Sequence, residues 1–322
     1  MTIKSIDQLL ENVSTVGLAG HVRPDGDCIG STLGVYNYIE KKYPNIRVDL
    51  YLESDLYKFS YLKNFDKIQR VPEDFIEYDL FMSLDCGSPD RLGLARSFFE
   101  GAKQTLCIDH HLSNQSCADY NYIVPAASST CELVYDLIDK EYLDKDIAAC
   151  LYTGIISDTG VFQYECTSSK TMEVAGVLMD TGINFSWIVE HSFFTKKYEQ
   201  LRITGLCFQK SVLHSGDRII SCIVSSDEIA SVNAKVRHMD GIASEMRSTY
   251  GIEASILLYE NEDGSYKMSL RSGEKVNVAL IAEQYGGGGH LRAAGATIRR
   301  NPDQCLKELL TVIEKQLDLY EG

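Results

Sequence analysis

Residues 16–27 read Val16-Gly-Leu-Ala-Gly-His21-Val-Arg-Pro-Asp25-Gly-Asp27, and this stretch decides the fold. Its first part, Val16–His21, is a short apolar run bounded by polar and turn residues, which is typical of a strand buried on both faces. A helical stretch, Asp27–Lys42, follows directly. The sequence therefore predicts a strand, a polar turn and a helix, with His21, Asp25 and Asp27 in the turn.

The same alternation continues through the first half of the chain. Alternating strands and helices are typical of a parallel sheet covered by helices. The further strands that we expect are Arg47–Leu52, Asp79–Asp85 and Gln104–Asp109, and the further helices are Ser128–Lys140 and Lys145–Ile156.

The second half of the chain has a different pattern. A hairpin turn at 261–264 joins two of its strands, and a glycine-rich loop separates its last helices. The expected elements are strands at Arg218–Val224, Glu253–Tyr259, Tyr266–Arg271 and Ala296–Arg299, and helices at Val276–Tyr285 and from Asp303. We therefore predict an α/β protein with a parallel-sheet domain at 1–190, a helical linker at 191–205 and a smaller α+β domain at 206–322.

Composition narrows the classes of function. The chain has 322 residues, ten cysteines without a C-x-x-C pair, and a formal net charge of −15. Such an acidic protein is expected to bind long nucleic acid poorly, because proteins bind this polyanion through basic surface. The chain has no run of about 18 apolar residues, so we expect no membrane span. The N-terminal residues resemble an amphipathic helix rather than a signal peptide, so we expect a cytoplasmic protein with reduced thiols.

Four clusters of acidic and histidine residues suggest a metal site. Because ligands gather beyond the carboxyl ends of parallel strands, clusters that are distant in sequence can meet there. Mixed oxygen and imidazole donors suit manganese better than magnesium, and the number of carboxylates is enough for two divalent ions. The clusters are His21–Asp27, Ser83-Leu-Asp85, Asp109-His110-His111 and Ser157-Asp158-Thr-Gly160.

Each cluster also has a structural explanation when taken alone. An aspartate after a strand commonly caps a helix or forms a turn. Asp25-Gly-Asp27 could be a β-turn, and His110-His111 could belong to a surface loop. Four such clusters, each after an apolar run, favour a metal site over four independent turns.

Together these residues resemble the DHH phosphoesterase family, whose motifs occur here in the family's order. The resemblance implies that His21, Asp25 and Asp85 hold one metal ion, and that Asp27, Asp85, His110 and Asp158 hold the other. It also implies catalytic roles for Asp85 as the bridging ligand, for Asp109 as the residue that orients the histidines, and for His111 near the substrate. Cys28, after Asp27, and Gln163, where many relatives have a basic residue, are departures whose effects stay open.

In the second half, Gly286–Gly289 and His290 resemble the family's associated substrate domain, as do Arg271 and Ser272. A run of glycines permits close approach of a ligand to the backbone, and arginine can bind phosphate with two hydrogen bonds. The substrate-binding residues that we expect are Arg271, Ser272, Gly287, Gly288, Gly289 and His290. A flexible turn and a surface arginine are the structural alternatives.

Among members of the family, the length and the lack of a membrane span favour a two-domain enzyme. Its expected substrates are short RNA or DNA oligonucleotides and nucleoside bisphosphates such as 3′-phosphoadenosine 5′-phosphate. The alternatives are a phosphodiesterase for cyclic dinucleotides or their linear products, and a nucleotide-binding sensor without catalysis. The exonuclease polarity, the native metal and the oligomeric state, for which a homodimer is one option, stay open.

Overall fold

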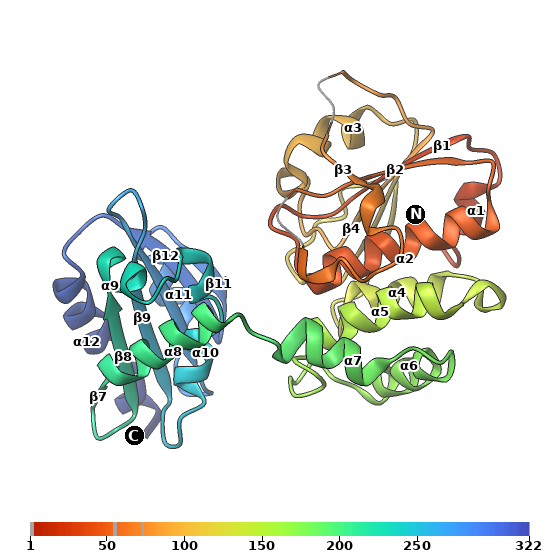
Figure 1. Cartoon of the computed structure of the whole chain (residues 1–322). Helices are drawn as coiled ribbons and strands as arrows, with labels where there is room; N and C mark the ends of the chain where they lie inside the picture. Colours follow the sequence, from red (N-terminus) through yellow and green to blue (C-terminus); the bar gives the residue numbers. More distant parts are fainter. Residues whose placement is uncertain (1–2, 54–56, 72–73, 322) are drawn as a thin grey trace. The chain divides into compact units, whose positions relative to one another are not determined.

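The computed structural model describes residues 3–53, 57–71 and 74–321. The chain divides into two compact units, Met1–Thr195 and Lys196–Gly322, and Figure 1 shows a separate sheet in each of them. Within the described ranges, no helix has the length and apolar character needed to cross a bilayer.

The N-terminal unit is built on a six-stranded parallel sheet of order β3-β2-β1-β4-β5-β6. The strands are β1 Thr15–Ala19, β2 Arg47–Tyr51, β3 Ile68–Gln69, β4 Leu80–Leu84, β5 Thr105–Asp109 and β6 Tyr120–Ile123. The four strands expected from the sequence are confirmed within one or two residues at most ends, whereas β3 and β6 were missed. Both are short and only partly buried, so they lack a continuous apolar run.

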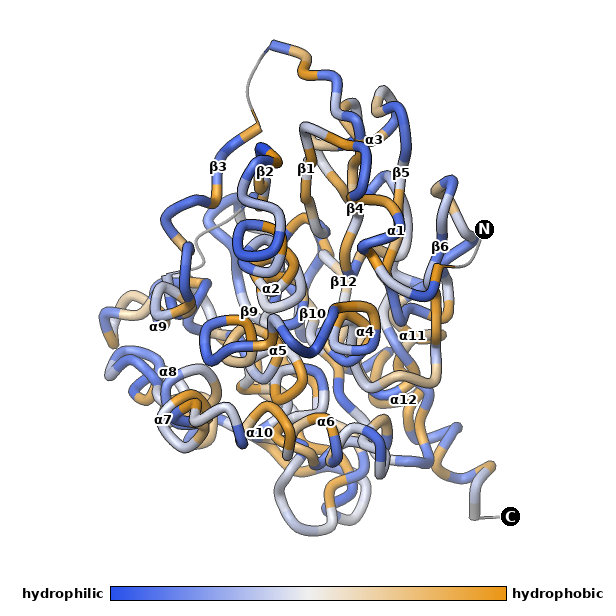
Figure 2. The backbone as a smooth tube through the Cα atoms, turned by 90° about the vertical axis from the view of Figure 1, so that its right-hand side faces the viewer, coloured by the Kyte–Doolittle hydropathy of each residue, from blue (hydrophilic) through white to orange (hydrophobic). Residues whose placement is uncertain are grey.

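Helices cover both faces of this sheet. One face is covered by α2 Gly26–Lys42 and α4 Thr130–Leu137. The helices α1 Asp7–Leu10, α5 Lys145–Asp158 and α6 Ser169–Asp180 add to the same apolar core, and α5 packs on α2 and α4, with α7 Phe185–Val189 following. The other face packs against α3, Arg96–Gly101, in an aromatic cluster. Figure 1 shows α2 and α3 on opposite sides of the strands, and Figure 2 shows apolar residues along α4 and α5.

The close contact between α2 and α5 depends on glycine. A Cβ atom at Gly30 would lie 2.5 Å from the backbone oxygen of Cys150 and 3.0 Å from the nitrogen of Gly154. Gly154, on α5, lies in turn beside Cys131 and Asp27. Because Asp27 lies in the first turn of α2, the absence of a side chain at these glycines lets the helices approach closely where the polar clusters converge.

The C-terminal unit has a mixed sheet of order β11-β12-β10-β9-β8-β7, in which only the β8–β9 pair among the described strands is parallel. Its elements are α8 Tyr198–Lys210, β7 Val212–His214, β8 Ile219–Val224, α9 Ser226–Ser231, α10 Ile242–Arg247, β9 Ala254–Glu260, β10 Tyr266–Ser272, α11 Val278–Glu283, β11 Gly288–His290, β12 Ala293–Ile298 and α12 Pro302–Glu321. The α+β architecture expected for this half is confirmed.

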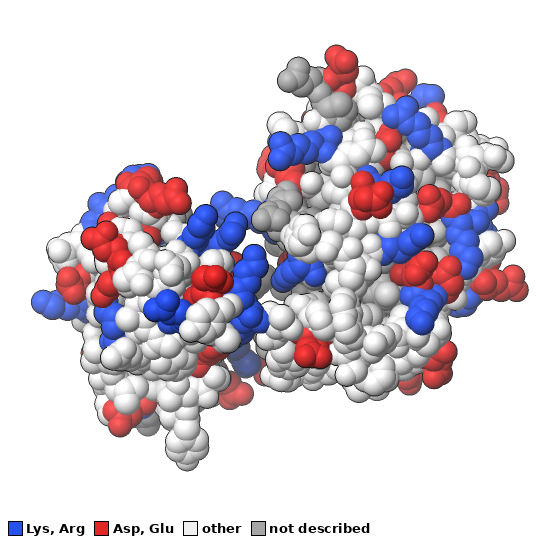
Figure 3. Space-filling model, viewed as in Figure 1, with Lys and Arg blue, Asp and Glu red and all other residues white. Residues whose placement is uncertain are grey.

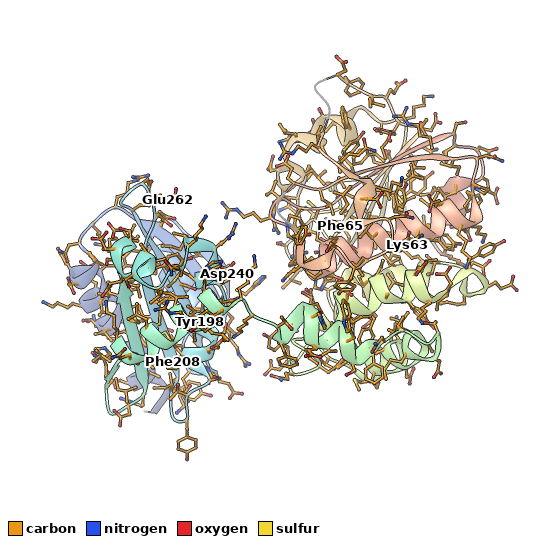
Figure 4. All side chains as sticks on the ribbon, in the orientation of Figure 1. Lys63, Phe65, Tyr198, Phe208, Asp240 and Glu262 are labelled. Carbon is orange, nitrogen blue, oxygen red and sulfur yellow. The ribbon has the colours of Figure 1, made fainter. Side chains whose placement is uncertain are left out.

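Two details of this half differ from the sequence expectation. The helix α8, labelled at Tyr198 and Phe208 in Figure 4, packs on β8 within the C-terminal unit, although its first residues were expected in a linker. The glycine run was expected to be a loop, but Gly288–His290 forms a short strand against β12. A Cβ at Gly287 would lie 2.1 Å from the oxygen of Gly295, so glycine is required for the close approach of these two segments.

Gly30→Ala should lower the free energy of unfolding by about 1–3 kcal/mol, because the added methyl group must displace backbone atoms of α5. Gly176→Ala is the matched control, since Gly176 lies on the exposed face of α6 with nothing within 4 Å of the added Cβ. It should be neutral or stabilising by up to about 1 kcal/mol through helix propensity. Urea unfolding of both variants measures the difference, and equal stabilities would contradict the packing argument.

Candidate metal centre

The polar clusters of the N-terminal unit meet at the carboxyl edge of its sheet. His21 follows β1, Asp85 follows β4, and His110 and His111 follow Asp109 at the end of β5. Asp158 is the last residue of α5. All five side chains take part in one set of short contacts, although they are separated by up to 137 positions in the chain.

Asp85 lies at the middle of this set. Its Oδ2 lies 3.5 Å from Nε2 of His21, and its Oδ1 lies 3.6 Å from Nε2 of His110. The two carboxylate oxygens therefore face two different imidazoles. Asp85 has a left-handed backbone conformation with φ 54°, which is unfavourable for a residue with a side chain and is typically retained at functional sites.

The two imidazoles bring further carboxylates to each side of Asp85. Nε2 of His21 lies 3.8 Å from Oδ2 of Asp25. Nε2 of His110 lies 3.1 Å from Oδ2 of Asp158 and 3.9 Å from Oδ2 of Asp27. The resulting donor groups, one on each side of Asp85, have the composition expected for two divalent cations.

Asp27 is completely buried and is held by the start of α4. The backbone nitrogen of Thr130 donates to its Oδ2 at 2.6 Å, and that of Cys131 donates to its Oδ1 at 2.9 Å. Amide groups at a helix N-terminus stabilise an anion because they point toward it and have no partner within the helix. The hydroxyl of Thr130 donates to Oδ1 of Asp85 at 3.1 Å. Ser129 caps this helix, because its hydroxyl oxygen accepts the backbone N–H of Glu132 at 3.1 Å.

Asp25 combines a structural role with an available oxygen. Its Oδ1 accepts the backbone N–H groups of Asp27 and Cys28, both at 3.1 Å, and so caps α2. Its Oδ2 is directed to His21. The turn interpretation and the ligand interpretation of this residue are therefore compatible.

Asp109 contacts His111 rather than His110. Its Oδ1 lies 2.7 Å from Nδ1 of His111, and its Oδ2 accepts the amide of Asn114 at 2.7 Å. Nδ1 of His110 instead faces the backbone oxygen of Ala127 at 3.4 Å. Each histidine thus has a partner on Nδ1, which fixes the ring and leaves Nε2 directed elsewhere.

Electrostatics in this centre favour the binding of cations. Burial and the nearby charges of Asp85 and Asp158 raise the pKa of Asp27 well above its usual value. Burial opposes protonation of His21 and His110, but hydrogen bonds to aspartates prevail and raise each pKa to about 10. Without metal, buried carboxylates are thus compensated by imidazolium groups, and a divalent ion would displace those protons.

Several contributors to the centre were missed in the sequence. The donor atom of Cys28 lies close to those of His21 and Asp85, although its position in a helix suggested only a small buried residue. Asn114 was not expected either. The hydroxyl-rich stretch at 128–130 before a helix indicates a capped helix start that can also bind an anion, and the amides there hold the Asp27 carboxylate. Gln163 is exposed.

Two of the predicted substrate residues in the C-terminal unit, Arg271 and His290, face the same strand. In the pairing register, Arg271 of β10 and His290 of β11 both face Ala293 of β12, so they lie in line across three strands. Residues in direct register project from the same face of a sheet, and two strand spacings separate these side chains by about 10 Å. Arg271 also donates to the hydroxyl of Ser244 at 3.1 Å.

The other predicted substrate residues serve the local structure. Ser272 is buried, and its hydroxyl donates to the backbone oxygen of Val276 at 2.7 Å. Gly287 and Gly289 are needed where β11 approaches β12, and a Cβ at Gly289 would lie 2.4 Å from the oxygen of Ala293. Gly288 is exposed, with open space where a Cβ would stand. His290 is exposed as well.

Comparison with known families assigns both units. Residues 15–155 match the DHH family N-terminal domain, and residues 220–318 match the DHHA1 domain. The chain is 28% identical to a protein of Thermus thermophilus named bifunctional oligoribonuclease and PAP phosphatase NrnA, over 93% of this chain and 89% of the relative. A Bacillus subtilis protein of the same name is also 28% identical, over 96% of this chain and 98% of the relative.

Two further comparisons extend the range of relatives. A cyclic-di-AMP phosphodiesterase PdeA of Listeria monocytogenes is 27% identical over 98% of this chain, which spans 49% of that relative. Among solved structures, an exopolyphosphatase-related protein of Bacteroides fragilis has a TM-score of 0.90 and 23% identity, with coverage of 98% of this chain and 96% of that one. This last likeness supports the fold.

The metal-free protein should lose stability as the pH rises from about 7 to 10. The pKa values of His21 and His110 are raised in the folded state from 6.5 to about 10, so their stabilising contribution is complete below pH 6.5 and is lost as they deprotonate. Urea unfolding in the presence of a chelator at several pH values measures the decline. His110→Gln should make this decline of the unfolding free energy with pH shallower. An identical slope for this variant would contradict the stabilising role assigned to the protonated His110.

Proposed function

We propose that this chain, which combines a DHH family N-terminal domain with a DHHA1 domain, is a metal-dependent phosphoesterase acting on short oligonucleotides and on 3′-phosphoadenosine 5′-phosphate. The relatives named as bifunctional oligoribonuclease and PAP phosphatase support this substrate class. The observation that carries the proposal is the position of Asp85, whose two oxygens face His21 on one side and His110 on the other.

The donor groups fit two manganese ions. His21, Asp25 and Asp85 would hold one ion, and Asp27, Asp85, His110 and Asp158 would hold the other. When bound, two such ions polarise the phosphoryl group, lower the pKa of a bound water and stabilise the leaving oxygen. Imidazole and carboxylate donors together favour manganese over magnesium, which prefers oxygen ligands and water.

The chain's own residues would orient the reacting groups. The hydrogen bond from His111 to Asp109 outweighs burial and raises the pKa of His111, which favours the protonated imidazole. With Nδ1 held by Asp109, Nε2 of His111 can donate to a phosphate oxygen or to the leaving group. The amides of α4 keep the Asp27 carboxylate fixed, which reduces the reorganisation needed when charge develops.

Residues of the C-terminal unit would also bind the substrate. Arg271 and His290 project from one face of its sheet and can both donate to anionic oxygens. Figure 3 shows Lys and Arg side chains gathered on the side of this unit that carries α10 and β11 in Figure 1. A local basic face supports binding of a small anion by a protein with a net charge of −15.

A phosphodiesterase acting on cyclic dinucleotides or linear dinucleotides is the second candidate, supported by the similarity to the Listeria protein. It would use the same centre, so only substrate preference separates the two candidates. A panel assay with manganese, comparing a dinucleotide, a longer RNA, the bisphosphate and a cyclic dinucleotide, decides between them. Turnover of none of these substrates would favour a nucleotide-binding sensor instead.

Asp85→Asn should abolish turnover and reduce the bound metal, because one neutral amide oxygen cannot serve two cations as a carboxylate does. Metal analysis and the manganese-supported assay measure both effects. Asp90→Asn, an exposed aspartate in the next turn, is the control and should keep activity and metal content. Near-wild-type turnover by Asp85→Asn would rule out a two-metal centre with this bridge.

His290→Ala should weaken substrate binding and leave metal content unchanged, because His290 belongs to a unit that contains none of the proposed ligands. Loss of a charge-assisted hydrogen bond would reduce the affinity by about 1.5–3 kcal/mol. Steady-state kinetics with the bisphosphate, together with metal analysis, provide the measurement. A fall in metal content with unchanged substrate affinity would contradict the assignment of His290.

A further inference from the structure

A pocket opens beside His21 on the N-terminal unit. Its lining consists of Val22, Arg23, Glu53 and Arg91. An adjoining cavity shares Val22 and Glu53 with this pocket and has His21 in its wall. The pocket therefore continues the His21 side of the metal centre outward, and two arginines are part of its wall.

The backbone holds these two arginines in neighbouring loops. The N–H of Val22 donates to the backbone oxygen of Arg91 at 2.7 Å, which ties the loop after β1 to the turn after β4. Arg23 has φ 57°, a left-handed conformation that is unfavourable for a residue with a side chain. Because such strain persists only where the surroundings enforce it, it commonly marks a functional position.

Gly93 permits the same loops to approach each other. It has φ 58°, and a Cβ there would lie 2.8 Å from both a carboxylate oxygen of Glu53 and a methyl carbon of Val22. That same oxygen of Glu53 accepts the N–H of Leu94 at 3.0 Å. The carboxylate of Glu53 is thus partly committed to the backbone of the turn.

The charges of Arg23 and Arg91 are available. Both residues are exposed, and neither has an ion pair within the described ranges of the chain. Two other arginines of this unit are paired: Arg47 with Asp49, and Arg96 with Asp90 and Glu100. Two unpaired guanidinium groups beside a cluster of aspartates form a local site for an anion.

We propose that Arg23 and Arg91 bind the second phosphate of the substrate, the one that is not cleaved. This inference rests on the proposed function. In both a 5′-phosphorylated dinucleotide and a nucleoside 3′,5′-bisphosphate, one ribose separates the scissile phosphate from a 5′-phosphate. With the scissile phosphate at the metal centre beside His21, the adjoining pocket receives the 5′-phosphate. The two arginines attract this 5′-phosphate, and the carboxylate of Glu53 repels it.

The test compares kcat/KM for a dinucleotide with a 5′-phosphate and for the same dinucleotide with a 5′-hydroxyl, in the manganese-loaded enzyme. The wild type should prefer the phosphorylated substrate. Arg23→Gln and Arg91→Gln should each reduce the ratio of the two kcat/KM values by about tenfold, the effect of losing one charge-assisted hydrogen bond. Arg96→Gln is the control, since Arg96 lies on α3 with its own acidic partners, and it should leave the ratio unchanged.

Glu53→Gln should raise the ratio, because the neutral amide no longer repels the phosphate while its oxygen can still accept from Leu94. A gain of this kind cannot arise from misfolding.

An unchanged ratio in the arginine variants would overturn the proposal, whether the two kcat/KM values stay the same or fall together. Wild-type turnover without a preference would also overturn it and leave the proposed function intact, whereas no turnover of either dinucleotide or of the bisphosphate would remove the proposed function itself.

Discussion

The fixed position of the Asp27 carboxylate is the constraint on which the N-terminal unit depends. This side chain is fully buried, and an unpaired buried carboxylate would be strongly unfavourable. The amides of Thr130 and Cys131 compensate it and connect the start of α2 to the start of α4. The close packing of α2 on α5 at Gly30 and Gly154 then brings the end of α5, and with it Asp158, to the same edge.

The cluster at that edge is unfavourable without cations. Burial and the charges of neighbouring aspartates raise the pKa of Asp27 and raise that of Asp158 to about 6. Imidazoles of His21 and His110 offset part of this repulsion when protonated. The fold holds these like charges close together, and bound divalent ions would relieve their electrostatic repulsion. The packing of the unit is thereby linked to its proposed chemistry.

The sequence predicted the parts of this arrangement that depend on local pattern. Apolar runs followed by acids or histidines located β1, β4 and β5, and strand ends in a parallel sheet are neighbours by construction. It did not predict that Asp109 contacts His111 rather than His110, or that Asn114 supports Asp109, because these contacts depend on long-range geometry. Only the second half of the glycine run, at 288–289, was misread as a loop, since glycine serves equally in turns and where two strands approach closely.

The central claim is that one carboxylate, Asp85, joins two metal sites. Anomalous diffraction at the manganese edge, on crystals grown with Mn²⁺, tests it most directly. The account predicts two manganese peaks in each chain, one between Asp85 and His21 and the other between Asp85 and His110. A single peak, or manganese bound without Asp85 among its ligands, would contradict it.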